Sequence, residues 1–272
     1  MDSSGWSAEN PFWGHCAVVS LVAQDLFGGD LLRASLEKVP GFENMRSHYW
    51  NKLADGSIID LTASQFGTRY PHGLNHESKQ RSYVLSYPET AKRYKLLALR
   101  LAKILNNNNP LFDDPIYQKC LFNALNSSCQ KLKFGCVITK DQTVISETHN
   151  QTLEPLKSFC EPTCIRLSMQ SRSDAMIGAC GHAEELGIWQ VVRAGVQTNE
   201  CELYVAGIDT RTYSVLIKKE SGFTCLRCGN QIYQSQLKQV YTPVVDRWVG
   251  INAQEALKSA LAFQAKLLGL NR

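Results

Sequence analysis

The sequence contains no apolar run that approaches the ~20 residues needed to cross a bilayer, which argues against a membrane partner. It also shows no secretory leader, because residues 1–5 are polar and no basic segment precedes an apolar one. Without these features the 10 cysteines are expected to be reduced thiols in the cytoplasm, not parts of a disulfide framework.

A second absence concerns metal motifs. Cys225 and Cys228 form a Cys-x-x-Cys pair, and the chain has no second pair with this spacing. A zinc ribbon takes its ligands from two such pairs and is therefore excluded, while a redox pair would need a thioredoxin-like context. The chain also carries Gly-His-Ala-Glu-Glu at residues 181–185, a pattern that predicts the start of a helix.

These two stretches together predict a catalytic zinc site. One imidazole and two thiolates, from His182, Cys225 and Cys228, hold a tetrahedral zinc ion and leave one position open. A water in that position has a pKa of roughly 7, so that hydroxide exists at neutral pH. Glu184 lies two positions after His182, where it can take the proton of this water and pass it to a leaving nitrogen.

His-x-Glu followed by Cys-x-x-Cys resembles the signature of zinc deaminases. The order of predicted elements makes the chain similar to the cytidine and deoxycytidylate deaminase superfamily over residues 113–250. This resemblance implies a three-layer α/β/α domain with a mixed sheet, a Zn²⁺ cofactor, and a contact between Asn150 and the sugar or base edge of the substrate. The alternative is that Asn150 simply ends a strand. The predicted helices span residues 115–131, 182–193, 225–237 and 253–267, and the predicted strands span residues 134–139, 144–148, 202–208, 213–217 and 239–245.

Three features depart from this family pattern. Thr224 stands where a proline usually precedes the first cysteine, which changes the turn but removes no ligand. The chain ends five residues after its predicted last helix, where many members that act on nucleic acids have a further strand and helix. Residues 151–180 are longer than a compact member needs, and the preferred interpretation is a loop that covers the pocket. A second metal site at Cys160 and Cys164 is the alternative, with no obvious third or fourth ligand.

The first part of the chain contains a different set of chemical groups. Cys16 starts a predicted helix, a position that favours the thiolate form of a cysteine. His48 and Asp60 lie on two strands, residues 47–53 and 58–62, joined by an Asp-Gly turn, where they could form a relay to the thiol.

This pattern resembles the small YunG-like family, and in outline a papain or transglutaminase core. The resemblance implies a small α+β papain-like domain of thiol hydrolase or transferase ancestry. The alternative is an inactive relic or a substrate-binding module in which Cys16 only packs in the core.

The predicted organisation is therefore a YunG-like module at residues 1–88, a connecting helix and linker at 89–112, and a zinc-dependent deaminase domain at 113–272. Residues 82–86 are predicted to be a short strand or an ordered linker. The net charge is +4, and residues 89–272 hold 22 basic and 16 acidic side chains against seven and nine in residues 1–88. A basic second part suits a phosphorylated substrate or a nucleic acid.

The sequence thus predicts a hydrolytic deaminase that releases ammonia from a nucleobase, nucleoside, nucleotide, RNA or DNA. A cytosine-type amine is favoured, guanine and adenine remain open, and assembly into a homo-oligomer is expected from the family resemblance. The competing hypothesis is a cysteine hydrolase or transferase that uses Cys16, His48 and Asp60 beside a structural zinc domain. A non-catalytic binding module is a third, and Glu184 argues against it because a binder gains nothing from a proton carrier.

Overall fold

The structure is a computed structural model that describes residues 6–160, 163–167, 180–217 and 224–270. The chain divides into two compact units, residues 1–100 and 101–272, and the division falls within helix α3 (Pro88–Leu105). Across the described ranges, none of the helices combines the length and the apolarity that a bilayer crossing needs.

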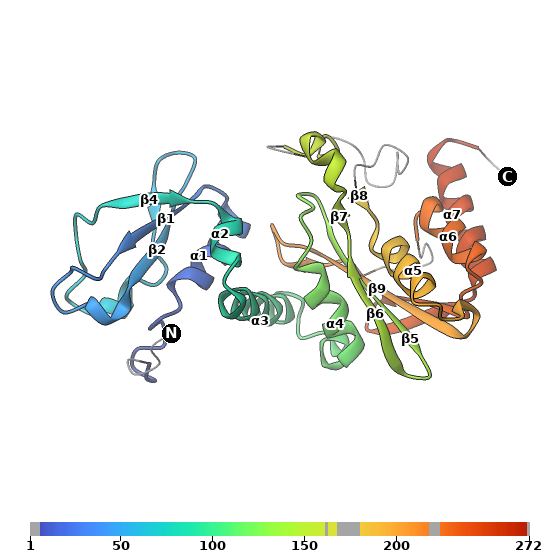
Figure 1. The fold of residues 1–272 in the computed structure, drawn as a ribbon, viewed down its shortest axis with the longest axis horizontal. Helices are drawn as coiled ribbons and strands as arrows, with labels where there is room; N and C mark the ends of the chain where they lie inside the picture. Colours follow the sequence, from blue (N-terminus) through green and yellow to red (C-terminus); the bar gives the residue numbers. More distant parts are fainter. Residues whose placement is uncertain (1–5, 161–162, 168–179, 218–223, 271–272) are drawn as a thin grey trace. The chain divides into compact units, whose positions relative to one another are not determined.

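The N-terminal unit is built on a four-stranded antiparallel sheet with the order β3-β2-β1-β4 (Figure 1). Helix α1 packs on strand β2 and ends at Gly28, whose φ of 72° lies in the left-handed region that glycine tolerates. Leu32, Ala34 and Trp50 form a buried cluster on the sheet, with Leu32 and Trp50 as direct cross-strand partners. The elements are α1 (Cys16–Phe27), β1 (Asp30–Ser35), β2 (Ser47–Lys52), β3 (Ile58–Ile59), β4 (His76–Lys79) and α2 (Arg81–Leu85), with 3₁₀ turns at Glu43–Met45 and Ala63–Phe66.

Residues 82–86 are not a strand, which corrects the prediction. Residues 82–85 belong to the short helix α2, which begins at Arg81, and Ser86 caps its C-terminus. One helical turn places Arg81 and Val84 on the same face, three residues apart. Arg81 forms an ion pair with Asp25 of α1, and Val84 is buried. This pairing of a cation and an apolar side chain needs the helical spacing, and the strand alternation would separate them.

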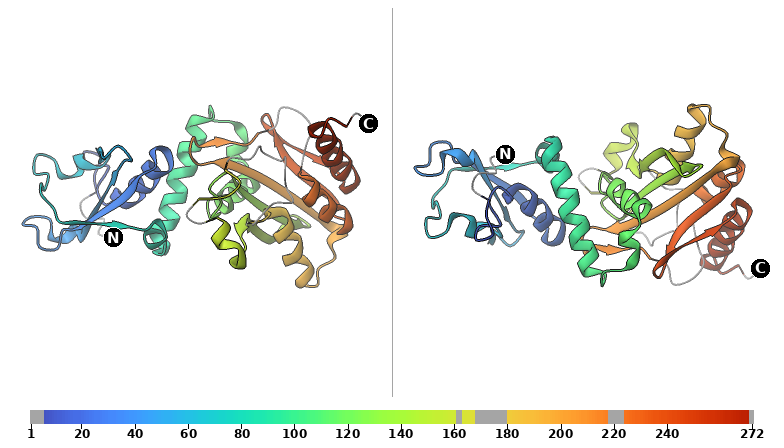
Figure 2. Two further views of the ribbon diagram at one scale, coloured as in Figure 1. Left: turned by 90° about the horizontal axis from the view of Figure 1, so that it is seen from above. Right: turned by 90° about the horizontal axis from the view of Figure 1, so that it is seen from below.

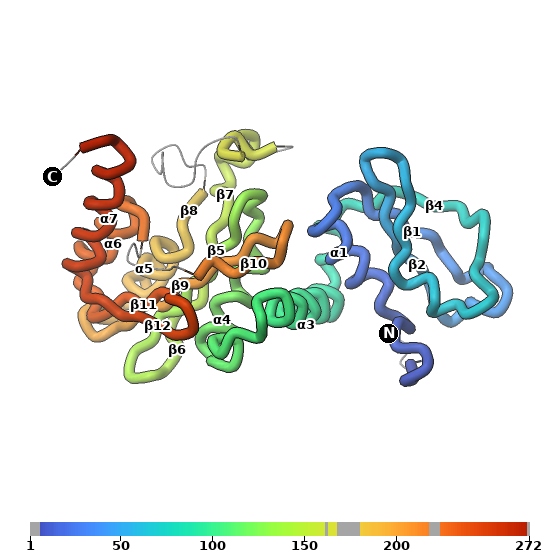
Figure 3. Tube along the Cα trace, turned by 180° about the vertical axis from the view of Figure 1, so that it is seen from behind, coloured from blue at the N-terminus to red at the C-terminus, as the bar shows by residue number. Residues whose placement is uncertain are grey.

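The C-terminal unit contains a mixed six-stranded sheet with the order β12-β11-β9-β5-β6. Strands β9 and β11 are parallel, and the other neighbours on this path are antiparallel. Strand β10 pairs with the C-terminal end of β9, as Figure 3 shows. A separate ribbon joins β7 to β8. The strands are β5 (Lys133–Lys140), β6 (Thr143–His149), β7 (Gln151–Thr152), β8 (Cys180–Gly181), β9 (Cys201–Asp209), β10 (Ser214–Val215), β11 (Gln239–Val244) and β12 (Arg247–Ile251).

Helices cover both faces of this sheet (Figures 1 and 2). Successive side chains of β5 point to opposite faces, so Gly135 faces α4 while Cys136 and Ile138 face α5. Helices α5, α6 and α7 share one buried core with Ile138 and Leu203. The domain is therefore three-layered with a mixed sheet, and the predicted fold class is confirmed. The helices are α4 (Pro115–Ala124), α5 (Ala183–Arg193), α6 (Leu226–Gln234) and α7 (Ala253–Leu267), with 3₁₀ turns at Pro110–Asp113, Glu154–Phe159 and Thr198–Glu200.

Gly135 allows α4 to approach the sheet closely. A Cβ atom at this position would lie 1.9 Å from the carbonyl oxygen of Cys120 and 2.7 Å from the backbone nitrogen of Ala124. Because both obstacles are backbone atoms of α4, Gly135→Ala should lower the free energy of unfolding by about 3 kcal/mol, at the upper end of overpacking effects. Urea unfolding of the full chain measures this change. Gly229→Ala, where the nearest atom is the Cβ of Ala260 at 3.2 Å, should have a far smaller effect, and equal effects would contradict the prediction.

Two elements differ from the sequence prediction in extent. Helix α4 ends at Ala124 instead of continuing to residue 131, and polar residues follow it, with Ser127 accepting a hydrogen bond from the backbone of Cys129. Strand β12 was not predicted. It follows β11 after the two-residue turn Val245-Asp246, in which Val245 has a φ of 57°. Tight hairpin turns usually contain glycine or asparagine. A β-branched residue at this position therefore gives no sequence signal for the hairpin.

Candidate metal site and substrate pocket

His182, Cys225 and Cys228 converge in the C-terminal unit. The Nδ1 atom of His182 lies 3.2 Å from the Sγ of Cys228 and 3.3 Å from the Sγ of Cys225. All three ligand atoms lie within 4.8 Å of one another. A tetrahedral zinc ion with ordinary Zn–N and Zn–S bonds separates such atoms by about 3.5 Å. The spacing and the donor set of one nitrogen and two sulfurs therefore fit zinc with one position left open.

The starts of two helices position these ligands. His182 is the residue before α5, and Cys225 is the residue before α6. The Sγ of Cys225 also accepts a hydrogen bond from the backbone N–H of Cys228 at 3.5 Å. The hydrogen bond from the Cys228 thiol and the nearby His182 lower the pKa of Cys225 to about 4, although burial acts in the opposite direction. The helix N-terminus and its partners thus favour the thiolate, the form that binds metal.

A bidentate ion pair joins the first turns of the two helices. The Nε and Nη2 atoms of Arg227 donate to the two carboxylate oxygens of Glu185 at 3.1 and 2.7 Å. Both side chains are largely buried, so solvent screens the pair less than it would on the surface. The pair fixes the distance between the helix that follows His182 and the helix that follows Cys225. Sequence analysis missed this role, although both residues lie inside the two motifs.

Glu184 is buried beside the three ligands and lines the same cavity. Burial, followed by the negative charge on Cys225, raises the pKa of this carboxyl. A buried carboxyl with a raised pKa can hold a proton and give it up again, which is the property a general acid–base group needs.

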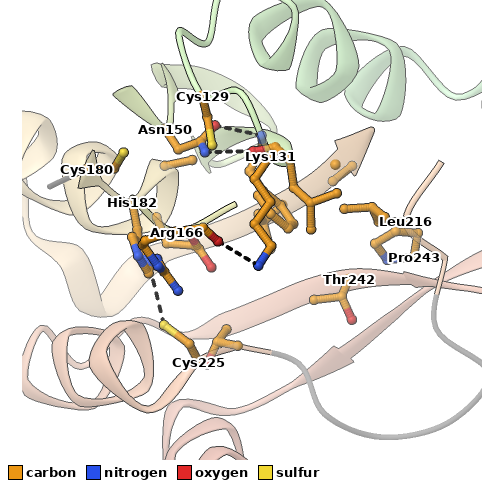
Figure 4. A pocket seen from close by; sticks show the side chains of 18 of the residues that line it. Cys129, Lys131, Asn150, Arg166, Cys180, His182, Leu216, Cys225, Thr242 and Pro243 are labelled. Atoms are coloured by element: carbon orange, nitrogen blue, oxygen red, sulfur yellow. Dashed lines mark hydrogen bonds between the residues drawn. The ribbon is translucent and has the colours of Figure 1, made fainter. Parts of the chain in front are cut away.

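A cavity of about 360 Å³ adjoins the candidate metal site (Figure 4). Its walls come from β9 at Val205 to Gly207, from β11 at Thr242 and Pro243, and from the start of α5. Strands β9 and β11 are parallel, and the cavity lies toward their carboxyl ends, where open α/β sheets bind ligands. Its size suits a small-molecule ligand.

Asn150 lines this cavity, but its side chain already bonds to the backbone. Its Oδ1 accepts from the N–H of Phe134 at 2.8 Å, and its Nδ2 donates to the carbonyl of Leu132 at 3.0 Å (Figure 4). These bonds hold the segment that leads into β5. The contact between Asn150 and a substrate stays a prediction.

Other residues that line the cavity carry buried polar atoms. The buried Nε of Arg166 and the buried hydroxyls of Thr224 and Thr242 have no hydrogen-bond partner among the residues that the structure describes. The Nζ of Lys131 also reaches the cavity and donates to the carbonyl of Arg166 at 3.1 Å (Figure 4). Buried polar atoms without partners are rare and are the expected contacts of a polar ligand. Sequence analysis missed Lys131, Arg166 and Thr242, whose positions give no signal without the fold.

The N-terminal unit places Cys16, His48 and Asp60 together. The Nε2 of the fully buried His48 lies 2.6 Å from the Oδ2 of Asp60, which also accepts from the hydroxyl of Tyr70 at 2.9 Å. Cys16 begins α1 and is buried, and its Sγ donates to the carbonyl of Ser47 at 3.8 Å. Burial lowers the pKa of His48, but the hydrogen bond to Asp60 and the interaction with the Cys16 thiol outweigh it and raise the pKa to about 9.

The raised pKa of His48 predicts a pH-dependent stability of the N-terminal unit. A histidine with a folded-state pKa of about 9 binds its proton more tightly than in the unfolded chain, where the pKa is 6.5. Its stabilising contribution is thus complete below about pH 6.5 and is lost as the pH rises through about 9. The protection of β1 and β2 amides against hydrogen exchange, corrected for the chemical rate, should fall by a few kcal/mol over this range.

A matched pair of variants isolates this effect. His48→Gln should remove the pH dependence between pH 6.5 and 9, whereas His72→Gln, at an exposed position, should retain it. A wild-type protein with the same protection at both ends of the range would contradict the prediction.

Two different protein families match the two parts of the chain. Residues 112–243 match the family model of the cytidine and deoxycytidylate deaminase zinc-binding region, and residues 1–106 match the family model of the YunG protein. The two resemblances predicted from the motifs are thereby confirmed, as is zinc as the metal of the C-terminal region. Residues 112–243 are thus similar to the zinc-binding region of this deaminase family. The papain-like outline stays a prediction.

Two individual proteins are similar to parts of the chain. The uncharacterized protein YunG of Bacillus subtilis (strain 168) is 34% identical over 82 residues, which are 30% of this chain and 64% of YunG. The chain thus spans less than two thirds of that protein. The crystal structure of dCMP deaminase from the cyanophage S-TIM5 in apo form aligns with 62% of this chain and 92% of its own, at 14% identity and a TM-score of 0.31.

Proposed function

We propose that the C-terminal domain is a hydrolytic deaminase that replaces the exocyclic amine of a nucleobase by a carbonyl oxygen and releases ammonia. The observation that carries this proposal is the convergence of His182, Cys225 and Cys228 beside a buried Glu184 on the wall of a small-molecule cavity. A closed structural site would need no cavity and no carboxyl next to the ligands. A cytosine-type amine is the favoured target, and guanine or adenine is the alternative.

The residues have separate roles in this proposal. His182, Cys225 and Cys228 would hold zinc, which when bound activates a water molecule for attack on the carbon that bears the amine. Glu184 would take a proton from that water and deliver it to the leaving nitrogen. The ion pair between Glu185 and Arg227 would keep the ligands at their spacing.

A phosphorylated substrate is supported by the charges at the cavity. Lys131 and Arg166 both line it, and the structure describes a buried guanidinium nitrogen there without a partner. Guanidinium and ammonium groups bind phosphate through charge-assisted hydrogen bonds. A nucleotide is therefore favoured over a free base or nucleoside, and RNA or DNA would need a route for a longer chain into the cavity.

An ammonia-release screen tests the proposal. Purified, zinc-loaded protein is incubated with bases, nucleosides, nucleotides and short RNA or DNA, and ammonia is measured for each. Release from at least one cytosine- or purine-containing substrate supports the proposal. The absence of release from all of them, with zinc bound at one equivalent or more, would overturn it.

Lys131→Met should separate phosphate binding from the chemical step. The variant keeps the length of the side chain and removes its charge, so KM for a nucleotide should rise about tenfold, the effect of losing one hydrogen bond to a charged group. KM for the matching nucleoside should change little. Lys133→Met is the control, because Lys133 donates to the carbonyl of Ser127 and does not line the cavity. An equal loss for nucleotide and nucleoside would contradict a phosphate contact.

The geometry at Cys16 favours a second candidate function for the N-terminal unit. A thiol at the start of a helix, near an imidazole that an aspartate orients, is the arrangement of cysteine hydrolases and transferases. Rapid and selective labelling of Cys16 by iodoacetamide at neutral pH, lost in His48→Gln, would support this function. Labelling no faster than that of the buried Cys120 would leave Cys16 as a packing residue.

Three further expectations belong to the same proposal. The YunG-like module spans residues 1–88, a connecting helix and linker spans 89–112, and the deaminase domain spans 113–272. The 10 cysteines all lie among the described residues and are unpaired, which supports a reducing compartment such as the cytoplasm. Sedimentation of the full chain would test the expected homo-oligomer.

A further inference from the structure

Phe134 carries the one phenyl, phenol or indole ring among the described residues that line the cavity beside the candidate metal site. It is the second residue of β5, and because strand side chains alternate, it faces the same side of the sheet as Cys136 and helix α5. The side chain packs against the apolar core of that layer but is only half-buried. Part of the ring is therefore open to the cavity.

A glycine on the neighbouring strand makes room for this ring. Gly207 of β9 is the direct cross-strand partner of Phe134. A Cβ atom on Gly207 would lie 2.7 Å from both the Cδ1 and the Cε1 of the ring, and 2.9 Å from the Cδ1 of Leu216. One edge of the ring thus occupies the space that a side chain at position 207 would fill, and Leu216 borders the same space.

One residue fixes the backbone of Phe134 at both of its polar groups. The N–H of Phe134 donates to the Oδ1 of Asn150 at 2.8 Å, and its carbonyl accepts from the backbone N–H of Asn150 at 3.0 Å. A ring with a fixed backbone and a close-fitting seat has little freedom left to lose when a ligand binds. The entropic cost of ordering it on binding is correspondingly small.

The sequence neighbours of this ring lie toward the two chemically different parts of the cavity. Lys131, three positions earlier, brings its ammonium group to the cavity (Figure 4). Cys136, two positions later, pairs with Thr148, whose hydroxyl donates to the carbonyl of Ala183 at 2.7 Å in the first turn of α5. That turn also contains Glu184. Along the chain the ring thus stands between a cation and the row of residues under the proton carrier.

A purely structural role is the alternative for Phe134. An aromatic side chain over a glycine covers a bare stretch of sheet, and designed sheets use this device. That role is complete once the ring covers Gly207. It gives no reason for the ring to border a cavity that also contains a candidate metal site and two cationic side chains.

We propose that Phe134 is the residue on which the nucleobase of the substrate stacks, and that Gly207 positions its ring. This inference rests on the proposed deaminase function and adds a residue that selects a planar aromatic ring. Every nucleobase has a π-face that can stack on an aromatic side chain. The contact therefore favours a base over an aliphatic amine without choosing between cytosine, adenine and guanine.

Nucleotide binding tests this contact without any turnover. The 5′-monophosphates of uridine, inosine and xanthosine, the products of cytosine, adenine and guanine deamination, are titrated calorimetrically into zinc-loaded full-length protein. Phe134→Leu should weaken the binding of whichever nucleotide wild type binds by about 10- to 100-fold, the effect of losing one stacked base. Ribose 5-phosphate, which has no base, should bind equally to both proteins. Phe134→Tyr keeps the ring and should bind the nucleotide nearly as wild type does.

Two further variants separate the ring contact from a loss of structure. Gly207→Ala should weaken nucleotide binding by a factor similar to that of Phe134→Leu, because the added methyl group displaces the ring. Phe122→Leu removes an aromatic ring of α4 that does not line the cavity and should bind as wild type. Elemental analysis should find the same zinc content in all of these proteins, which shows that the metal ligands remain in place.

Proton NMR of the wild-type complex gives a measurement that needs no folded variant. Base protons that lie over the face of an aromatic ring move upfield because of its ring current, and they should show nuclear Overhauser contacts to the ring protons of Phe134. A bound base without these contacts, unchanged affinity in Phe134→Leu, or a wild type that binds none of the three nucleotides would overturn the stacking proposal. The deaminase proposal fails on a different result, the absence of ammonia release, and it would survive unchanged affinity in Phe134→Leu.

Discussion

Glu184→Gln should reduce turnover by about 10²- to 10⁴-fold while zinc content stays unchanged. Glutamine keeps the size and much of the hydrogen bonding of the side chain but carries no exchangeable carboxyl proton. The buried position of Glu184 and the raised pKa of its carboxyl suit it for holding a proton between the attacking water and the leaving nitrogen. Steady-state ammonia release with the best substrate of the screen measures the loss, and elemental analysis measures the metal.

The same substitution at a distant glutamate separates the loss of the Glu184 proton carrier from a general loss of negative charge. Glu200→Gln removes an exposed carboxylate that pairs with Lys140 and should leave turnover unchanged. If Glu184→Gln kept full activity, the proton-carrier role would be wrong. If it lost the metal as well, Glu184 would act as a ligand and the open coordination position would disappear.

Cys228→Ser should abolish turnover and remove zinc from the catalytic site. Cys228 is fully buried, and its Sγ lies 3.2 Å from the Nδ1 of His182, so its thiolate is placed to bind the same ion as that imidazole. A serine hydroxyl is a far poorer ligand than a thiolate at neutral pH, because its proton is not lost. Exhaustive dialysis against a chelator should produce the same inactive state in wild type, and added zinc should restore activity there but not in the variant.

The position-matched control for this prediction is Cys201→Ser. Cys201 is also buried on the same core, but its sulfur donates to the carbonyl of Gln197, and among the described residues it belongs to no group that could hold a metal ion. Its replacement should lower stability slightly and leave zinc content and turnover near wild type. Full activity in Cys228→Ser would show that the metal is held by other groups.

The candidate site could be predicted from the sequence where short motifs carry the chemistry. His182, Glu184, Cys225 and Cys228 stand in two helix-start motifs, so local spacing alone places their side chains at the first turns of α5 and α6. The cavity residues Arg166 and Thr242 have no such local signal. Their role depends on the long-range pairing of β9 with β11 and on the path of the chain after β7, which periodicity does not encode.

The strands of the sheet could likewise be predicted only where the local sequence carries a signal. Residues 134–139 are predicted to be a strand and lie within β5, whose side chains point alternately toward α4 and α5. Strand β12 escaped prediction because Val245 occupies a left-handed turn position that sequence rules reserve for glycine and asparagine.

The two helix starts that carry His182 and Cys225 have a consequence for how the catalytic metal is acquired. Because the Arg227–Glu185 pair and the shared core of α5 and α6 join the two helix starts through contacts that do not involve the metal, we expect this region to fold without the ion. Zinc would then load into a finished scaffold, unlike a zinc finger, which folds only as it binds. Catalytic competence would follow the free zinc concentration around the protein and could be withdrawn by a chelator without unfolding the chain.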